Sequence, residues 1–199
     1  MDKKTEDILR AALYVPCETM EQLHRWIKIY LGLDMPNVII CDDEIRHQSS
    51  NSSPMHLIWE MYSKAMVGDD PKFTQVLGYS AREGAKTLSA AIFEILCLFH
   101  LRCNVVHLAS LESQSKFAQD YCAKFLKRPV LREYLTSKNK RNLEITRYES
   151  EDGAIISPVQ WEQLLPGEKS KYEACVNNIQ ILVSTVESCN GIHSRSGCK

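Results

Sequence analysis

The sequence predicts an α/β fold in which a parallel sheet lies between two layers of helices. Three consecutive segments lead to this prediction: Phe73–Leu77 (FTQVL) is typical of a strand, Lys86–Leu101 has the apolar spacing of a buried helix, and Asn104–Ala109 (NVVHLA) is a continuous apolar run. Such a run is characteristic of a central strand that is buried on both faces of a parallel sheet. The order strand, helix, strand in turn implies a right-handed crossover between parallel strands.

Helices are predicted ahead of this unit. Met20–Leu33 places apolar side chains on one helical stripe. A second helix is expected over Pro54–Val67, because proline is favoured in the first turn of a helix. Asp42–Pro54 is polar and rich in turn-forming residues, which indicates a linker. We therefore expect a helical lead-in and linker over residues 1–50 and one α/β domain over residues 51–199.

Further helices and strands are expected downstream. Glu112–Lys127 is amphipathic at helical spacing and should follow the Asn104–Ala109 strand as a helix. Asn142–Tyr148 and Ala154–Ile156 are predicted to be short strands of a hairpin that turns at Gly153. Ile179–Thr185 (IQILVST) is a further apolar strand.

Composition limits the function classes. The chain has 199 residues, of which 44% are hydrophobic, enough for a packed core. Its formal net charge of -1 argues against a general electrostatic footprint for nucleic acid, so any contact with DNA must come from a local patch or a further segment. The charged N-terminus lacks the apolar region of a secretory signal, and no apolar run is long enough to cross a bilayer. The eight cysteines form no CxxC pair, which indicates reduced thiols rather than a structural zinc site.

The candidate site is the segment Ser80–Thr87 (SAREGAKT), between the predicted strand and the predicted helix. The phosphate-loop pattern is GxxxxGK[ST]; Lys86 and Thr87 match it, whereas Ser80 and Ala85 stand at its two glycine positions. A helix that opens here aims backbone N–H groups and its positive end at an anion. Lys86 would then reach the β- and γ-phosphates of ATP, and the Thr87 hydroxyl would bind Mg²⁺. The alternative is a helix start whose lysine faces solvent.

The stretch AREGAKT resembles the deviant phosphate loop of the large terminase subunits of tailed phages and related viruses, which carries an arginine early in the loop. The resemblance implies that Arg82 senses the γ-phosphate and couples the state of ATP to subunit movement. It also implies that the rest of the loop surrounds the ATP phosphates, namely Ser80, Ala81, Glu83, Gly84, Ala85, Lys86 and Thr87. Arg82 could instead pair with Glu83 or another nearby acid.

Two further segments resemble the same family. The helix that begins at Pro54 carries Trp59 and Tyr62, as does the terminase element that lies near the adenine, so Trp59 is a candidate for the adenine side; core packing is the alternative. The tail ILVSTVESCNGIHSRSG resembles the stretch just before the strand that ends in the catalytic Asp-Glu pair. No such pair and no nuclease domain follow in this sequence. We therefore expect a chain that ends before its catalytic carboxylate. Three explanations are open: a gene split by an intron or an intein, a fragment, or a decayed copy.

The resemblance implies a RecA/ASCE-like P-loop NTPase with ATP and Mg²⁺ as cofactors. It implies a motor that packages viral double-stranded DNA into procapsids in the host cytoplasm, outside any membrane, with the portal, the small terminase subunit and a complementary C-terminal fragment as partners. At most weak ATP hydrolysis is expected from this chain alone. The alternatives are another helicase-like P-loop ATPase and an assembly module that does not hydrolyse ATP.

Other polar features allow two interpretations each. The basic run Lys138–Arg141 could meet DNA phosphates or be a solvated turn. Ser110, Glu112 and Gln114 should lie at the carboxyl edge of the sheet, where they could touch DNA or a neighbouring subunit, or cap the next helix. Trp161 could mark an interaction segment or be a half-buried aromatic.

Overall fold

The computed structural model describes residues 2–37, 53–67 and 85–183. The chain divides into two compact units, one made of Met1–Val15 with Glu94–Lys199 and the other of Pro16–Phe93. The boundary predicted between residues 50 and 51 lies outside the described residues and stays a prediction.

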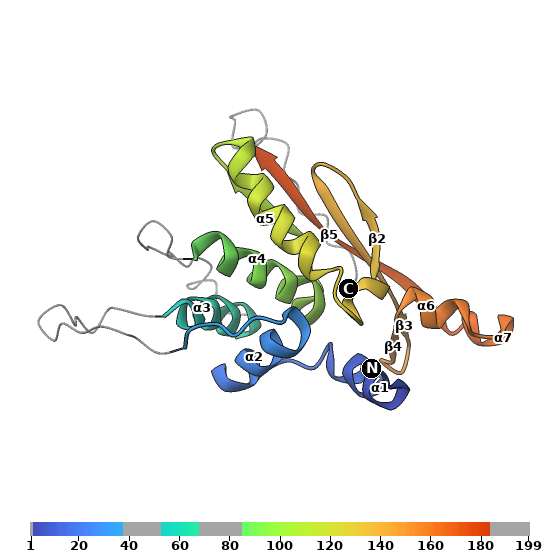
Figure 1. The fold of residues 1–199 in the computed structure, drawn as a ribbon. Helices are drawn as coiled ribbons and strands as arrows, with labels where there is room; N and C mark the ends of the chain where they lie inside the picture. The colour runs from blue at the N-terminus through green and yellow to red at the C-terminus, as the bar shows by residue number, and fades with distance from the viewer. Residues whose placement is uncertain (1, 38–52, 68–84, 184–199) are drawn as a thin grey trace, which may run out of the picture. The chain divides into compact units, whose positions relative to one another are not determined.

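The first unit contains a mixed five-stranded sheet (Figure 1). Its strands are β1 (Val105–Ala109), β2 (Leu135–Lys138), β3 (Asn142–Ser150), β4 (Ile155–Ile156) and β5 (Tyr172–Val183). The order is β1-β5-β3-β2, with β4 paired to β3. Only β1 and β5 are parallel; β3 is antiparallel to β2, β4 and β5. The α/β prediction is therefore confirmed, but the described sheet is not the parallel sheet that we expected.

Short connections explain the antiparallel half of the sheet, because parallel neighbours need a long crossover. Residues 139–141 join β2 to β3, and Asn139 N donates to Asn142 O at 2.9 Å. The turn from β3 to β4 contains Gly153 with a φ of 84°, and Gly153 N donates to Ser150 O at 2.9 Å. The predicted hairpin around Gly153 is confirmed.

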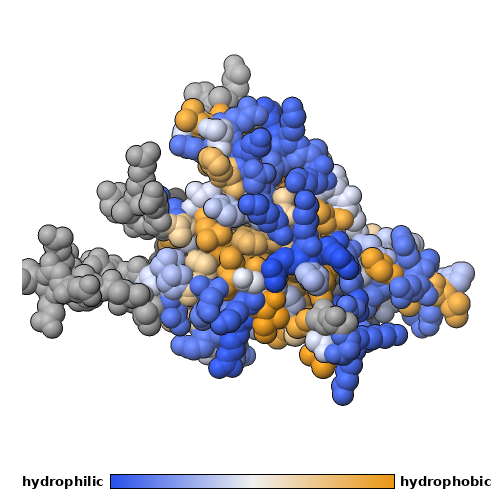
Figure 2. Space-filling model, in the orientation of Figure 1, coloured by the Kyte–Doolittle hydropathy of each residue, from blue (hydrophilic) through white to orange (hydrophobic). Residues whose placement is uncertain are grey.

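One face of the sheet is buried. Leu143 and Ile145 of β3 and Ile179 of β5 are fully inaccessible to solvent. Helix α5 (Glu112–Phe125) contacts β5 and β1 and buries Ala118, Cys122 and Phe125. Phe117 of the same helix is 63% exposed, and hydrophilic residues cover much of the surrounding surface (Figure 2). The apolar content of the strands and of one stripe of α5 is what drives this packing.

The other face of the sheet is open at β1. Val106 and Leu108 of β1 are 39% and 46% exposed, and Val176 of β5 is 43% exposed. Among the described strands, β1 pairs with β5 alone. The strand predicted at Asn104–Ala109 is confirmed, but the expected burial on both faces is wrong for the described part of the chain. An apolar run shows that a strand can be buried; it does not say how many layers cover it.

Glu133 links three short segments of the first unit. It lies in η4 (Leu131–Glu133) and accepts from Arg10 of α1 (Lys3–Ala12) at 2.7 and 3.1 Å. It also accepts from the hydroxyl of Ser157, which caps α6 (Pro158–Glu162), at 2.9 Å. The ring of Trp161 in α6 stacks on the ring of Tyr148, with the two centroids 4.5 Å apart. Trp161 is half-buried, so it is a packed aromatic. Helix α7 (Pro166–Lys169) follows α6.

A buried arginine lies within the sheet. Arg147 of β3 is 1% exposed; its guanidinium donates to Glu149 and to the side-chain oxygen of Asn177 on β5. Asn177 donates in turn to Asn104 at 3.3 Å. A buried charge persists only where it is paired and hydrogen-bonded, and this network satisfies that condition.

The second unit is helical. It contains α2 (Met20–Trp26), which continues as the π-helical turn η1 (Ile27–Leu31), then α3 (Pro54–Val67), and α4 (Lys86–Leu96) as far as Phe93. The hydroxyl of Thr19 caps α2, and Gly32 with a φ of 67° ends η1. In the first unit, α4 runs on into the turn η3 (Cys97–Leu101). The helices predicted at Met20–Leu33, Pro54–Val67 and Lys86–Leu101 are confirmed, whereas the strand predicted at Phe73–Leu77 lies outside the described residues.

Candidate functional site

The N-terminus of α4 is the described part of the predicted phosphate loop. Ala85 immediately precedes the helix and has a φ of 56°. Its carbonyl accepts from Ser89 N at 2.8 Å, which is the first hydrogen bond of the helix. Left-handed backbone is unusual for a residue with a Cβ and is the conformation that glycine adopts freely. Ala85 stands where the phosphate-loop pattern has its second glycine.

Lys86 and Thr87 form the first turn of α4, and both are exposed. The predicted position of these side chains at a helix start is confirmed; their roles toward ATP and Mg²⁺ stay predictions. Ser89, which sequence reasoning missed, is fully buried, and its hydroxyl has no hydrogen-bond partner among the described residues. A serine in the first turn gives no sequence signal of such burial.

The remaining predicted site residues cannot be joined to this helix start. Ser80, Ala81, Arg82, Glu83 and Gly84 lie outside the described residues. On α3, Trp59 is half-buried and packs against Tyr62, with ring centroids 6.0 Å apart. That contact fits core packing, and the adenine role of Trp59 stays a prediction.

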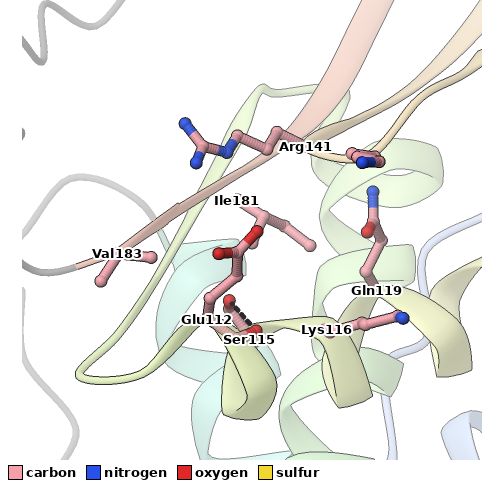
Figure 3. Close-up of a pocket in the computed structure, with 8 residues that line it drawn as sticks. Glu112, Ser115, Lys116, Gln119, Arg141, Ile181 and Val183 are labelled. Carbon is pink, nitrogen blue, oxygen red and sulfur yellow. Dashed lines mark hydrogen bonds between the residues drawn. The ribbon is translucent and has the colours of Figure 1, made fainter.

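A pocket of about 200 Å³ lies in the first unit (Figure 3). Glu112, Ser115, Lys116 and Gln119 line it from successive turns of α5, Lys140 and Arg141 from the turn between β2 and β3, and Ile181 and Val183 from the end of β5. The carboxyl ends of the parallel strands β1 and β5 lie at one edge, since Ala109 pairs with Val183. Ligands of open α/β sheets bind outside this kind of edge.

Hydrogen bonds hold the walls of the pocket together. The amide of Gln119, 5% exposed, donates to Asn139 O at 2.8 Å and so ties α5 to the turn. Asn139 accepts from Arg141 N at 2.9 Å through its side chain, and Arg141 O accepts from Ile181 N at 2.8 Å. The turn is thereby fixed against both α5 and β5, so the pocket is formed in advance of any ligand.

A buried ionisable group joins α4, β1 and α5. The carboxylate of Glu94 hydrogen-bonds His107 Nδ1 through one oxygen and accepts from the Cys122 thiol at 3.3 Å through the other. The bond to Glu94 raises the pKa of His107, and burial raises the pKa of the Cys122 thiol well above its usual value. Because the reactive form of a cysteine is the thiolate, Cys122 is not a nucleophile here, and the group acts in packing.

Among the described residues, the cysteines Cys17, Cys97, Cys103, Cys122 and Cys175 form no disulfide. Cys103 is exposed, and a hydrogen bond from the Cys97 thiol lowers its pKa to about 7. No cluster of metal-binding side chains is present among the described residues. The described helices include none that is long and apolar enough to cross a membrane.

Comparisons of the chain with protein-family models, with curated proteins and with solved structures found no match.

Proposed function

We propose that the chain is the ATP-binding part of a large terminase subunit, a RecA/ASCE-like P-loop ATPase that packages viral double-stranded DNA into procapsids. The observation that carries the proposal is the start of α4. Ala85 has a φ of 56° at the place of the loop glycine, and Lys86 and Thr87 follow in the first turn. Lys86 would bind the β- and γ-phosphates, Thr87 would bind Mg²⁺, and Arg82 would sense the γ-phosphate.

The backbone at Ala85 suits an anion for a geometric reason. A residue with positive φ next to a helical residue turns successive N–H groups toward one point, and such a concavity binds anions. The same N–H groups begin a helix, whose N-terminal end is positive. Lys86 adds a full charge on a flexible stem, which is the usual complement of phosphates in such loops.

The mixed sheet bears on the proposal in two ways. The parallel pair β1 and β5 supports it, because two parallel strands whose carboxyl ends share an edge are the frame that a P-loop ATPase uses. The antiparallel strand β3, on the other side of β5, departs from a fully parallel sheet. We therefore propose a P-loop core with an antiparallel extension made of β2, β3 and β4.

Calorimetric titration of the chain with Mg-ATP tests the proposal. The intact chain should bind, and Lys86→Ala should weaken binding by at least about tenfold, since a charge-assisted hydrogen bond contributes about 1.5–3 kcal/mol. Thr87→Val should weaken binding of Mg-ATP more than binding of ATP in the presence of a chelator, because only the first uses the hydroxyl as a metal ligand. Lys127→Ala, at an exposed position of the first unit, is the matched control and should bind as the intact chain does.

An intact chain that does not bind Mg-ATP, or a Lys86→Ala variant that binds as tightly as the control, would refute the nucleotide site. A non-hydrolysing assembly module is the second candidate. The methyl group of Ala85 favours it, because this group occupies space that glycine would leave to a phosphate. That candidate predicts no turnover even when a complementary C-terminal fragment is supplied.

A further inference from the structure

Three cationic side chains line the pocket of the first unit and form no ion pair among the described residues. Lys116 of α5 and Lys140 and Arg141 of the β2–β3 turn all line it, and all three are exposed. Among the described residues, none of these side chains has an ion-pair partner. Glu112 is the one acidic side chain in the lining. The lining therefore carries a formal surplus of positive charge.

The remaining lining is apolar or hydrogen-bonded. Ile181 is 4% exposed and forms an apolar wall together with Val183. The Ser115 hydroxyl donates to Glu112 O of its own helix at 2.9 Å (Figure 3). The amide of Gln119 donates to Asn139 O. A ligand would thus meet positive charge at the mouth and apolar surface inside.

We propose that this pocket binds the phosphodiester backbone of a nucleic acid, with Lys116, Lys140 and Arg141 on phosphates and Ile181 and Val183 against a sugar. A backbone offers phosphates at regular spacing, and cations that come from two elements can meet more than one of them. A single small phosphate ligand is typically held by buried cations or backbone amides. Here every cation is exposed at the mouth, which favours the longer polyanion.

The inference does not depend on nucleotide binding at Lys86. It predicts binding that is mainly electrostatic and therefore depends strongly on salt. Each phosphate contact contributes about 0.9 to the slope of log K against log salt for duplex DNA and about 0.7 for a single strand.

The test uses the full chain and a fluorescein-labelled oligonucleotide, single-stranded or as a duplex, with fluorescence anisotropy measured over a series of salt concentrations. The triple variant Lys116→Gln, Lys140→Gln, Arg141→Gln should lose at least about tenfold in affinity at low salt, and its salt slope should fall by about 2–3. Glu112→Gln should bind more tightly than the intact chain, because it removes the negative charge of the lining.

The matched control is Lys127→Gln, Arg128→Gln, Arg132→Gln, which removes three charges from exposed positions of the same unit beyond the other end of α5. It should retain the affinity and the salt slope of the intact chain. Circular dichroism on each variant establishes that it is folded. Equal losses in both triple variants, failure of the intact chain to bind either form of DNA, or complete displacement of DNA by equimolar inorganic phosphate would each overturn the proposal.

Discussion

Replacing Ala85 with glycine should stabilise the protein, although glycine usually destabilises a helical region. With a φ of 56°, the Cβ of Ala85 crowds the backbone, at a cost of about 1–2 kcal/mol for an L-residue. Glycine removes that cost but adds freedom to the unfolded chain, which offsets about 0.4–1 kcal/mol. The difference gives a net stabilisation of about 0.8 kcal/mol in Ala85→Gly, within a range of about 0–1.6 kcal/mol.

The matched control is Ala90→Gly, which removes the same methyl group from the interior of the same helix. Ala90 has ordinary helical backbone, so glycine there should cost about 1 kcal/mol. Urea unfolding of the two variants and the intact chain, monitored by circular dichroism, measures both free energies. The two substitutions should therefore shift the midpoint in opposite directions.

Equal destabilisation by the two substitutions would refute the positive φ at Ala85, and the nucleotide proposal would lose the observation that carries it. If Ala85→Gly is stabilising, the same variant bears on function. Removing the methyl group opens space for a phosphate, so Mg-ATP should bind more tightly to Ala85→Gly than to the intact chain. Unchanged affinity in a stabilised variant would favour the assembly module over the ATPase.

Three further predictions concern the first unit. Gly153→Ala should lower the free energy of unfolding by about 1 kcal/mol, because Gly153 has a φ of 84°, which strains a residue with a Cβ even though that Cβ would touch no other atom. The control is Gly167→Ala inside α7, where an added Cβ also meets open space. This variant should be neutral or stabilising in the same urea titration. Arg147→Ala should cost about 1–3 kcal/mol, since it leaves the buried side-chain oxygen of Asn177 without its donor, and the absence of any measurable loss would contradict the network. The raised pKa of His107 contributes stability that is present below pH about 6.5 and is lost as pH rises through the folded pKa. The stability difference between the intact chain and His107→Gln should therefore shrink as pH rises above about 6.5, and a difference that grows would contradict the bond to Glu94.

The helices follow from local sequence. Pro54–Val67 has the same bounds in the sequence prediction and in α3, because proline fixes the first turn and an apolar stripe continues to Val67. The longest strand does not follow in this way. We expected it from Ile179, but β5 begins at Tyr172. Its first half (YEACVNN) mixes polar and apolar residues and pairs with β3. Pairing between segments so far apart leaves no local signal in the sequence.

The candidate site, too, follows only in part from local sequence. The pattern at Lys86 and Thr87 predicted a helix start, because a strand-like run and a helical run flank it. It did not predict the backbone of Ala85, where the sequence alone favours ordinary φ for an alanine. The basic run Lys138–Arg141 was visible as a possible phosphate contact, yet Lys116, which lines the same pocket, lies on helix α5, more than twenty residues earlier in the chain. Only the packing of α5 against β5 brings the two together.

A net charge near zero does not argue against binding of nucleic acid when charges of opposite sign lie far apart. In the first unit, β3 begins at Asn142, next to the basic turn, and ends at Ser150, next to the exposed acids Glu151 and Asp152. Nine residues of strand separate these ends by about 27 Å at about 3.3 Å per residue. Screening at physiological salt acts over about 8 Å, so the acidic turn cannot neutralise the basic pocket. The formal charge of -1 belongs to the whole chain and therefore does not describe the local surface around Lys116, Lys140 and Arg141.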